Sequence, residues 1–298
     1  MVAASQDTHS RTTVPEPPRF EALRVFISRF FRQPLGVMGL IVLVTLVVIA
    51  AFGPDLAPFD PYELGTQRLA PPSAEHWAGT DQLGRDVWTR IMYGIRPSIT
   101  VAFGAVAISI ITGTVVGTIS AYTGGLFDLV MQRITDALEA LPALFLGILV
   151  LTIVKPSYGS LMFAIGLVML PVAQRVVRAS TLAVKNSDFV TASRVLGATN
   201  TRIIVRHILP NILSPVLVIA SAELGGAILT SSSLSFLGFG TPPPEPSLGA
   251  MVSGDGRQFM TQAPWLVVAP AAVISLSILA ANFIGDALRD VLDPRLRA

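Results

Sequence analysis

The residue types that most often carry catalysis are few in this 298-residue chain. Its three histidines are His9, His76 and His207, and none lies in a long apolar run, so no imidazole is placed beside a serine or a metal there. Cysteine is absent, which removes thiolate nucleophiles and thiolate metal sites. Neither lysine follows a glycine, so the Gly-Lys pair of a phosphate-binding loop is missing. We therefore expect no catalytic residue, no metal site and no cofactor within this chain.

Glu223 is the one carboxylate deep inside an apolar run, LVIASAELGGAILT. A charge in such a run is costly, so the side chain is expected to face a cavity or a partner. One interpretation places Glu223, with Ser231 and Ser235, on the wall of a path for a polar solute. The other makes Glu223 a protonated or hydrogen-bonded packing position, where the following glycines permit close approach of a second chain.

Residues 191–211, TASRVLGATNTRIIVRHILPN, interrupt the apolar runs with basic side chains. Apolar residues recur there at helical spacing on both sides of Gly197, which predicts two short helices joined by a turn. Pro210 has no backbone N–H and is expected near the start of the next helix. Such a segment either lies on anionic lipid headgroups or docks on a partner protein.

The elements that position these residues are long and apolar. The chain is 52% hydrophobic and 13% charged, about half the charge of a typical soluble domain. About 20 apolar residues span the hydrocarbon core of a membrane. Six segments are long enough, which predicts an all-α membrane protein with six transmembrane helices; they lie near Leu35–Gly53, Ile99–Ala121, Leu138–Val154, Ser160–Val177, Ile212–Ser232 and Pro264–Ile284.

The distribution of Lys and Arg gives the orientation of these spans. With the N-terminus inside, 15 basic residues fall on the inside and 6 on the outside, and cytoplasmic loops are the basic ones. We therefore expect an N-in, C-in topology in the cell's inner or plasma membrane. The expected parts are a cytoplasmic tail (1–33), a first helix (34–53), an extracytoplasmic segment (54–98), a five-helix core (99–284) that includes the cytoplasmic loop 178–211, and a C-terminal tail (285–298).

Two outer segments carry further signals. Residues 81–93, DQLGRDVWTRIMY, place Leu83, Val87, Ile91 and Met92 on one helical face, which predicts an amphipathic helix on the outer membrane surface. The loop 234–263 is rich in Gly and Pro and too long for a plain connection. It is expected either to meet another protein or to form a structural lid.

At this point the sequence resembles a known family. TASRVLG followed after nine residues by HILP is similar to the "EAA" loop of ABC importer permeases, in particular the "C-type" subunit of the peptide/nickel subfamily. Ala192, Gly197, Leu209 and Pro210 match that pattern, whereas Thr191, Ser193 and His207 depart from it. GTDQLGRD from Gly79, LSFLGFGTPPPEPSLGAM from Leu234 and NFIGDALRDVLDPRLR from Asn282 extend the resemblance in the family's order.

The resemblance implies a type I (MetI-like) permease core with separate partners. These are a homologous second permease, two ABC ATPase subunits that hold ATP and Mg, an extracytoplasmic substrate-binding protein and membrane lipid, with no nucleic acid. It also implies that the loop couples the ATPase to the spans. The coupling residues are then Thr191, Ala192, Ser193, Arg194, Gly197, Ala198, Arg202, His207, Leu209 and Pro210.

For this subfamily the resemblance favours import of di- or oligopeptides. Nickel chelates, glutathione and oligosaccharides stay open, because specificity resides largely in the binding protein. An ATPase-independent channel or secondary transporter is the competing class, but no inverted repeat or pair of intramembrane charges supports it. An intramembrane hydrolase is disfavoured by the histidine positions. Import rather than export rests on the resemblance alone.

Overall fold

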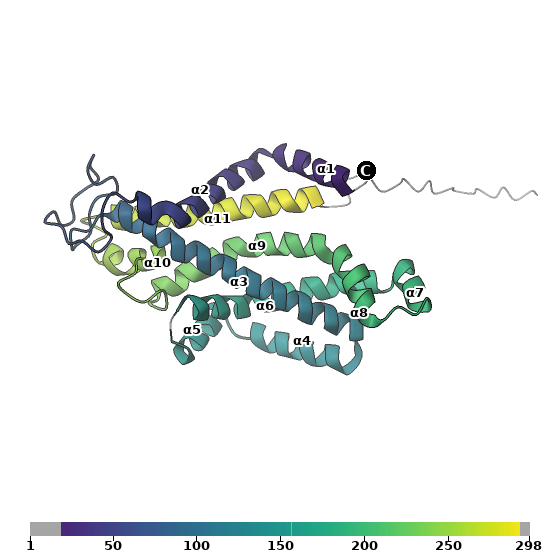
Figure 1. The fold of residues 1–298 in the computed structure, drawn as a ribbon. Helices are drawn as coiled ribbons and strands as arrows, with labels where there is room; N and C mark the ends of the chain where they lie inside the picture. Colours follow the sequence, from purple (N-terminus) through teal and green to yellow (C-terminus); the bar gives the residue numbers. More distant parts are fainter. Residues whose placement is uncertain (1–18, 156, 293–298) are drawn as a thin grey trace, which may run out of the picture.

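The computed structural model describes residues 19–155 and 157–292, and every regular element in these residues is a helix (Figure 1). Five helices are each long and apolar enough to cross a membrane, and one bent pair adds a sixth crossing if its two helices together form one span. In chain order the crossings are α2 (Pro34–Leu56), α3 (Val87–Thr123), α4 (Gly125–Glu139) with α5 (Ala143–Ile153), α6 (Tyr158–Lys185), α9 (Leu209–Phe236) and α11 (Trp265–Leu292).

The third crossing is bent, and the predicted single helix Leu138–Val154 is wrong. The axes of α4 and α5 differ by 93°. Pro142 explains the break, because it lacks an N–H and disfavours a helical backbone at Leu141 before it. The pair still joins the two ends of the bundle: α3 ends where Tyr122 bonds Asn200, and α6 begins where Tyr158 bonds Glu245 at the opposite end (Figure 1).

We call these two ends the hairpin end and the loop end. The hairpin end holds α7 (Asp188–Val195) and α8 (Asn200–Ile203), and the loop end holds residues 57–86 and 237–264. The loop end also contains the short helices α10 (Leu248–Met251) and η2 (Val252–Gly256).

The segment predicted as a separate amphipathic helix at the surface is instead the start of α3. Asp86 caps α3 by accepting a hydrogen bond from the Thr89 N–H at 2.7 Å, and the helix then runs unbroken for 37 residues. At 1.5 Å per residue that is about 55 Å, well beyond the roughly 30 Å hydrocarbon core. Val87 and Ile91 are fully buried, because this extension packs against the loop end.

Close approach of α3 and α6 forms the centre of the bundle. Gly113 and Gly117 lie one turn apart on α3, and a Cβ atom on Gly117 would come within 2.7 Å of the Gln174 carbonyl oxygen. Small residues at this spacing let two membrane helices pack backbone to backbone.

Ion pairs fasten the amphipathic α4 to the same helix, α6. Arg178 donates to both carboxylate oxygens of Asp128, at 2.8 and 2.6 Å, and Arg175 pairs with Asp136 and Glu139. The charged face of α4 is therefore partnered along its length, which explains how a helix this polar packs beside an apolar bundle.

Both described chain ends lie at the hairpin end. Residues 19–31 of the predicted N-terminal tail form the helix α1 (Arg19–Phe31), whose Phe30 packs on Ala287 and Val291 of α11. Helix α11 likewise continues to Leu292, so the described part of the predicted C-terminal tail is helical. Residues 1–18 and 293–298 of these tails lie outside the described residues.

Candidate functional site: the α7–α8 hairpin and two cavities

The segment around Gly197 forms the predicted pair of helices. Helix α7 ends at Val195, Gly197 adopts φ of +81°, and α8 starts at Asn200. A positive φ is costly for residues with a Cβ atom, so glycine is suited to this turn. The cap of α8 is Thr199, whose Oγ1 accepts a hydrogen bond from the Arg202 N–H. We call residues 188–203 the hairpin.

Helix α8 passes without interruption into η1 (Ile204–Ile208), a π-helical turn, and then into α9. Pro210 is the second residue of α9, near the start of that helix as expected, and α9 continues directly from η1 in one helical run from Asn200 to Phe236. The π-helical turn of η1 lies just before Pro210, which cannot donate to the carbonyl one turn earlier, and π-turns of this kind often occur at functional sites. Helix α8 of the hairpin, η1 and α9 thus form one continuous helical run.

An apolar cluster fixes the base of the hairpin to three transmembrane helices. Its buried members are Tyr122 of α3, Val177 of α6, Val190 and Ile203 of the hairpin, and Ile208, Ile212 and Val216. Tyr122 also donates a 2.9 Å hydrogen bond to Asn200, and the guanidinium of Arg194 lies 5.9 Å from its ring centre. The base of the hairpin therefore packs on α3, α6 and α9 together.

The tip of the hairpin is apolar and uncovered. Val195 and Leu196, at the end of α7 beside the Gly197 turn, are 82% and 86% exposed. Of the ten predicted coupling residues, six are exposed and four half-buried. The exposed ones are Thr191, Ala192, Arg194, Gly197, Arg202 and Pro210, and the half-buried ones are Ser193, Ala198, His207 and Leu209.

Two departures from the family pattern contact each other. Ser193 Oγ lies 3.3 Å from His207 Nε2, so they join α7 to η1. The Ser193 hydroxyl also donates to the Phe189 carbonyl at 2.8 Å. A polar pair therefore stands at the two positions where the pattern has apolar residues.

The predicted path residues face the interior of this chain. Glu223 is 7% exposed, and its Oε2 accepts a 3.0 Å hydrogen bond from Ser109 of α3. Ser231 and Ser235 are also buried. This placement fits the packing interpretation of Glu223, but the contact is with α3 of the same chain and not with a second chain.

Two cavities lie on a different face of α9, between it and α11. The larger, about 820 Å³, is at the hairpin end and is lined by Val176, Asn211, Ser214, Pro215, Val218, Ile219, Ala222, Asn282, Gly285, Asp286, Arg289 and Leu292. The smaller, about 440 Å³, lies nearer the loop end and includes Leu229, Ser232 and Ser233 of α9 with Ala271, Ile274, Ser275 and Ile278 of α11. The cavity-lining residues thus neighbour the predicted ones: Ala222 beside Glu223, and Ser232 beside Ser231.

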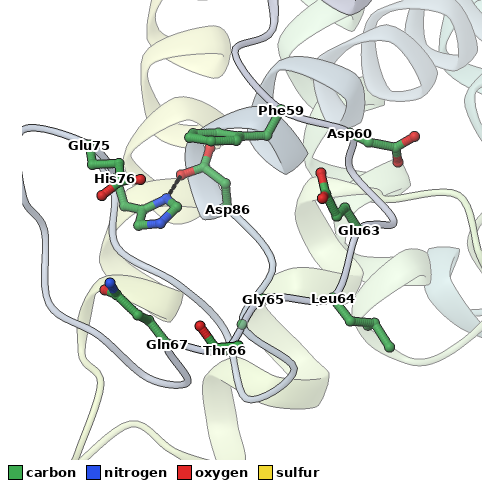
Figure 2. Close-up of a pocket in the computed structure, with 11 residues that line it drawn as sticks. Phe59, Asp60, Glu63, Leu64, Gly65, Thr66, Gln67, Glu75, His76 and Asp86 are labelled. Carbon is green, nitrogen blue, oxygen red and sulfur yellow. Dashed lines mark hydrogen bonds and ion pairs between the residues drawn. The ribbon is translucent and has the colours of Figure 1, made fainter.

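A third, smaller hollow of about 190 Å³ lies in residues 59–86 at the loop end. Figure 2 shows the His76 ring turned toward Asp86, with Asp60, Glu63 and Glu75 around the hollow. His76 Nδ1 lies 2.9 Å from Asp86 Oδ1, and the other oxygen of Asp86 caps α3. Among residues 19–155 and 157–292, no group of three or more acidic, His or Cys side chains is arranged to hold a metal ion. The hollow is therefore an acidic surface feature above Asp86, the residue that caps the N-terminus of α3.

Family comparisons agree with this architecture. Residues 113–298 match the family described as binding-protein-dependent transport system inner membrane component. Residues 22–72 match a second description, N-terminal TM domain of oligopeptide transport permease C. The chain belongs to the family of binding-protein-dependent transport system inner membrane components. It is a multi-pass inner-membrane protein, and the family assignment made from the sequence is confirmed.

Individual relatives match over nearly the whole chain. A dipeptide transport system permease protein of Alkalihalophilus pseudofirmus is 42% identical over 90% of this chain and 88% of its own length. An oligopeptide permease protein of Bacillus subtilis is 37% identical over 90% and 88%. A glutathione transport system permease protein of Pectobacterium atrosepticum is 37% identical over 92% of both chains. Members of this family are transport components and not themselves catalysts.

Sequence reasoning missed the cavity and its charged residues. Asn282, Asp286 and Arg289 recur at spacings of four and three, which places them on one face of α11. That spacing was visible, but it equally fits a solvated helix face. Only the position of α9, whose residues line the same cavity, distinguishes a cavity wall from a solvated helix face.

Proposed function

We propose that this chain is a permease subunit of an ATP-driven importer of di- and oligopeptides. Two of the three relatives named above are dipeptide and oligopeptide permeases. The glutathione permease supports a neighbouring alternative, because glutathione is itself a small peptide. Nickel chelates and oligosaccharides have no support among these three relatives.

The observation that carries the coupling role is the exposed apolar tip on a firmly held hairpin. Contact with another protein would remove Val195 and Leu196 from water, and burial of a leucine side chain stabilises a complex by roughly 1.5–3 kcal/mol. We assign that partner as an ATPase subunit. Closure of two ATPases on ATP and Mg then moves the hairpin as a rigid lever, and α9 carries the motion into the bundle.

The remaining partners follow the same proposal. A homologous second permease completes the translocation path, and an extracytoplasmic binding protein docks at the loop end, where residues 57–86 and 237–264 project. In this arrangement the hairpin is cytoplasmic, as the distribution of Lys and Arg suggests.

The test is a pull-down of the tagged chain in mild detergent, with the co-purifying proteins identified and quantified by mass spectrometry. We expect a second permease and P-loop ATPases in stoichiometric amounts, and the binding protein to give access to the substrate. Recovery of the chain alone, or only as a self-oligomer, would make the hairpin a membrane-surface element and favour a channel or secondary transporter.

A further inference from the structure

The size and lining of the cavity of about 820 Å³ at the hairpin end bear on which substrate this chain contacts. It lies between α6, α9 and α11 and is large enough for a short peptide. Most of its wall is apolar, from Val176, Pro215, Val218, Ile219 and Leu292, but one side presents both signs of charge.

The two charged residues of this cavity are Asp286 and Arg289, three positions apart on α11. Neither makes an ion pair or a hydrogen bond with another residue that the structure describes. This contrasts with α4 and α6, where Asp128, Asp136, Arg175 and Arg178 are all paired. Both side chains are exposed beside the apolar wall, and a carboxylate and a guanidinium in that position are matched in charge to a ligand that carries both signs.

We propose that this cavity is a subsite through which a short zwitterionic peptide passes, with Asp286 binding its ammonium group and Arg289 its carboxylate. The inference rests on the proposed function and names the residues of this chain that meet the substrate. Residues three apart on a helix lie about 5–6 Å apart at Cβ, and the long Arg side chain extends that reach. An extended peptide rises about 3.3–3.6 Å per residue, so the termini of a di- or tripeptide match this spacing.

Polar groups for the peptide backbone lie on both sides of the charged pair. Asn282 stands one turn before Asp286 on α11, and Asn211 and Ser214 face it from α9. Gly225 makes room for the Asn282 amide, because a Cβ atom there would come within 2.5 Å of Asn282 Oδ1. Amide side chains can both donate to and accept from peptide groups without regard to the peptide's side chains. Such a subsite favours a peptide terminus over a particular sequence.

A second cavity lies further along the same two helices, α9 and α11, toward the loop end. Three serines, Ser232, Ser233 and Ser275, line it together with apolar residues. Figure 1 shows α9 and α11 side by side along the length of the molecule. The two cavities lie one after the other on the same side of α9, with the close approach of α9 and α11 at Gly225 between them, and that side is turned by about 100° from Glu223.

The test compares uptake of radiolabelled tri-alanine by the complete importer in proteoliposomes, with its binding protein present. Asp286→Asn and Arg289→Gln each remove one charge, and Asp290→Asn is the matched control, because Asp290 is one residue further along α11 and outside the cavity. Loss of a hydrogen bond to a charged group is worth about 1.5–3 kcal/mol. We expect the maximal uptake rate to fall by roughly tenfold or more in each cavity variant. Asp290→Asn should stay near wild type, as should binding-protein-stimulated ATP hydrolysis in all three variants.

Each other outcome overturns the proposal. Unchanged uptake in both cavity variants, or an equal loss in Asp290→Asn, would remove the subsite. Parallel loss of ATP hydrolysis would place the two residues in an ATPase contact. If the wild-type importer takes up no tri-alanine, the proposed peptide function itself fails, which is a separate result.

A cysteine experiment covers the case in which these variants do not assemble. The chain has no cysteine, so Ala222→Cys places a single thiol in the cavity and Asn186→Cys places one at the exposed end of α6. Excess tri-alanine during turnover is expected to slow labelling of Ala222→Cys by a water-soluble thiosulfonate at least threefold, and to leave Asn186→Cys unchanged. Equal labelling rates with and without the peptide, or protection by a second permease alone, would contradict a peptide site.

Discussion

At the residue scale, two adjacent apolar side chains decide whether the hairpin engages a partner. Leu196 is 86% exposed, and nothing in the described bundle covers it. We predict that Leu196→Glu abolishes ATPase co-purification and uptake while the amount of chain in the membrane stays unchanged. The reason is that a carboxylate cannot be buried in an apolar contact without a charge partner. Quantitative pull-down and uptake measure the two effects.

The matched control for that change is Leu64→Glu, since Leu64 is also a highly exposed leucine, 68%, but lies at the loop end. It should keep the ATPase. Equal loss from both substitutions would mean that the charge harms folding, and not a specific contact.

Gly197 makes a second prediction at this scale. Its φ is +81°, and an added Cβ atom would meet no atom within 4 Å, so only backbone conformation limits the residue here. Gly197→Pro fixes φ near −65° and removes the N–H that donates to the Arg194 carbonyl at 3.0 Å. We expect uptake below about a tenth of wild type with normal insertion and normal pairing with the second permease. Gly197→Asn should remain within about twofold, because asparagine tolerates positive φ. Equal activity of the two variants would contradict a required turn.

At the scale of elements, the bent third crossing depends on ion pairs. Arg178 and Asp128 form a two-bond pair between α6 and α4, and both side chains are less than a third exposed. Asp128→Asn leaves Arg178 without its charge partner, at a cost of about 2 kcal/mol. We predict a fall of several degrees in the melting temperature of the purified chain in detergent, together with faster proteolysis at the α4–α5 bend.

The charge-swapped double variant, Asp128→Arg with Arg178→Asp, is the control for that prediction. It should recover at least half of the lost melting temperature, because the pair is restored in reverse. A double variant whose melting temperature stays as low as that of Asp128→Asn would show that side-chain packing at this site, and not the ion pair, sets the stability.

The elements also show how far the sequence leads. Apolar length located the five long crossings and the apolar half of the bent α4–α5 pair, and helical spacing around a glycine located the hairpin, since both signals are local. The break at Pro142 was missed because the apolar run 143–154 was long enough to hide it. The face of α9 was missed because adjacent positions on a helix differ by about 100°, so Glu223 faces α3 while Ala222 faces the cavity. Only the positions of the neighbouring helices determine which face of α9 points toward α3 and which points toward the cavity.

At the scale of the whole molecule, the number of crossings and the orientation form one testable statement. Leu64 lies after α2 and Leu196 after α6, so α3, the α4–α5 pair and α6 separate them. Three crossings place the two leucines on opposite sides of the membrane, whereas a re-entrant α4–α5 would leave two crossings and place them on the same side. We predict that a membrane-impermeant maleimide, applied from outside the inner membrane, labels Leu64→Cys and not Leu196→Cys. Inverted vesicles should reverse that pattern. Because the chain has no other cysteine, each variant reports one position.

Labelling of both thiols from one side would exclude the sixth crossing. Labelling of Leu196→Cys alone from outside would keep the six crossings, invert the orientation and remove the hairpin from the reach of a cytoplasmic ATPase.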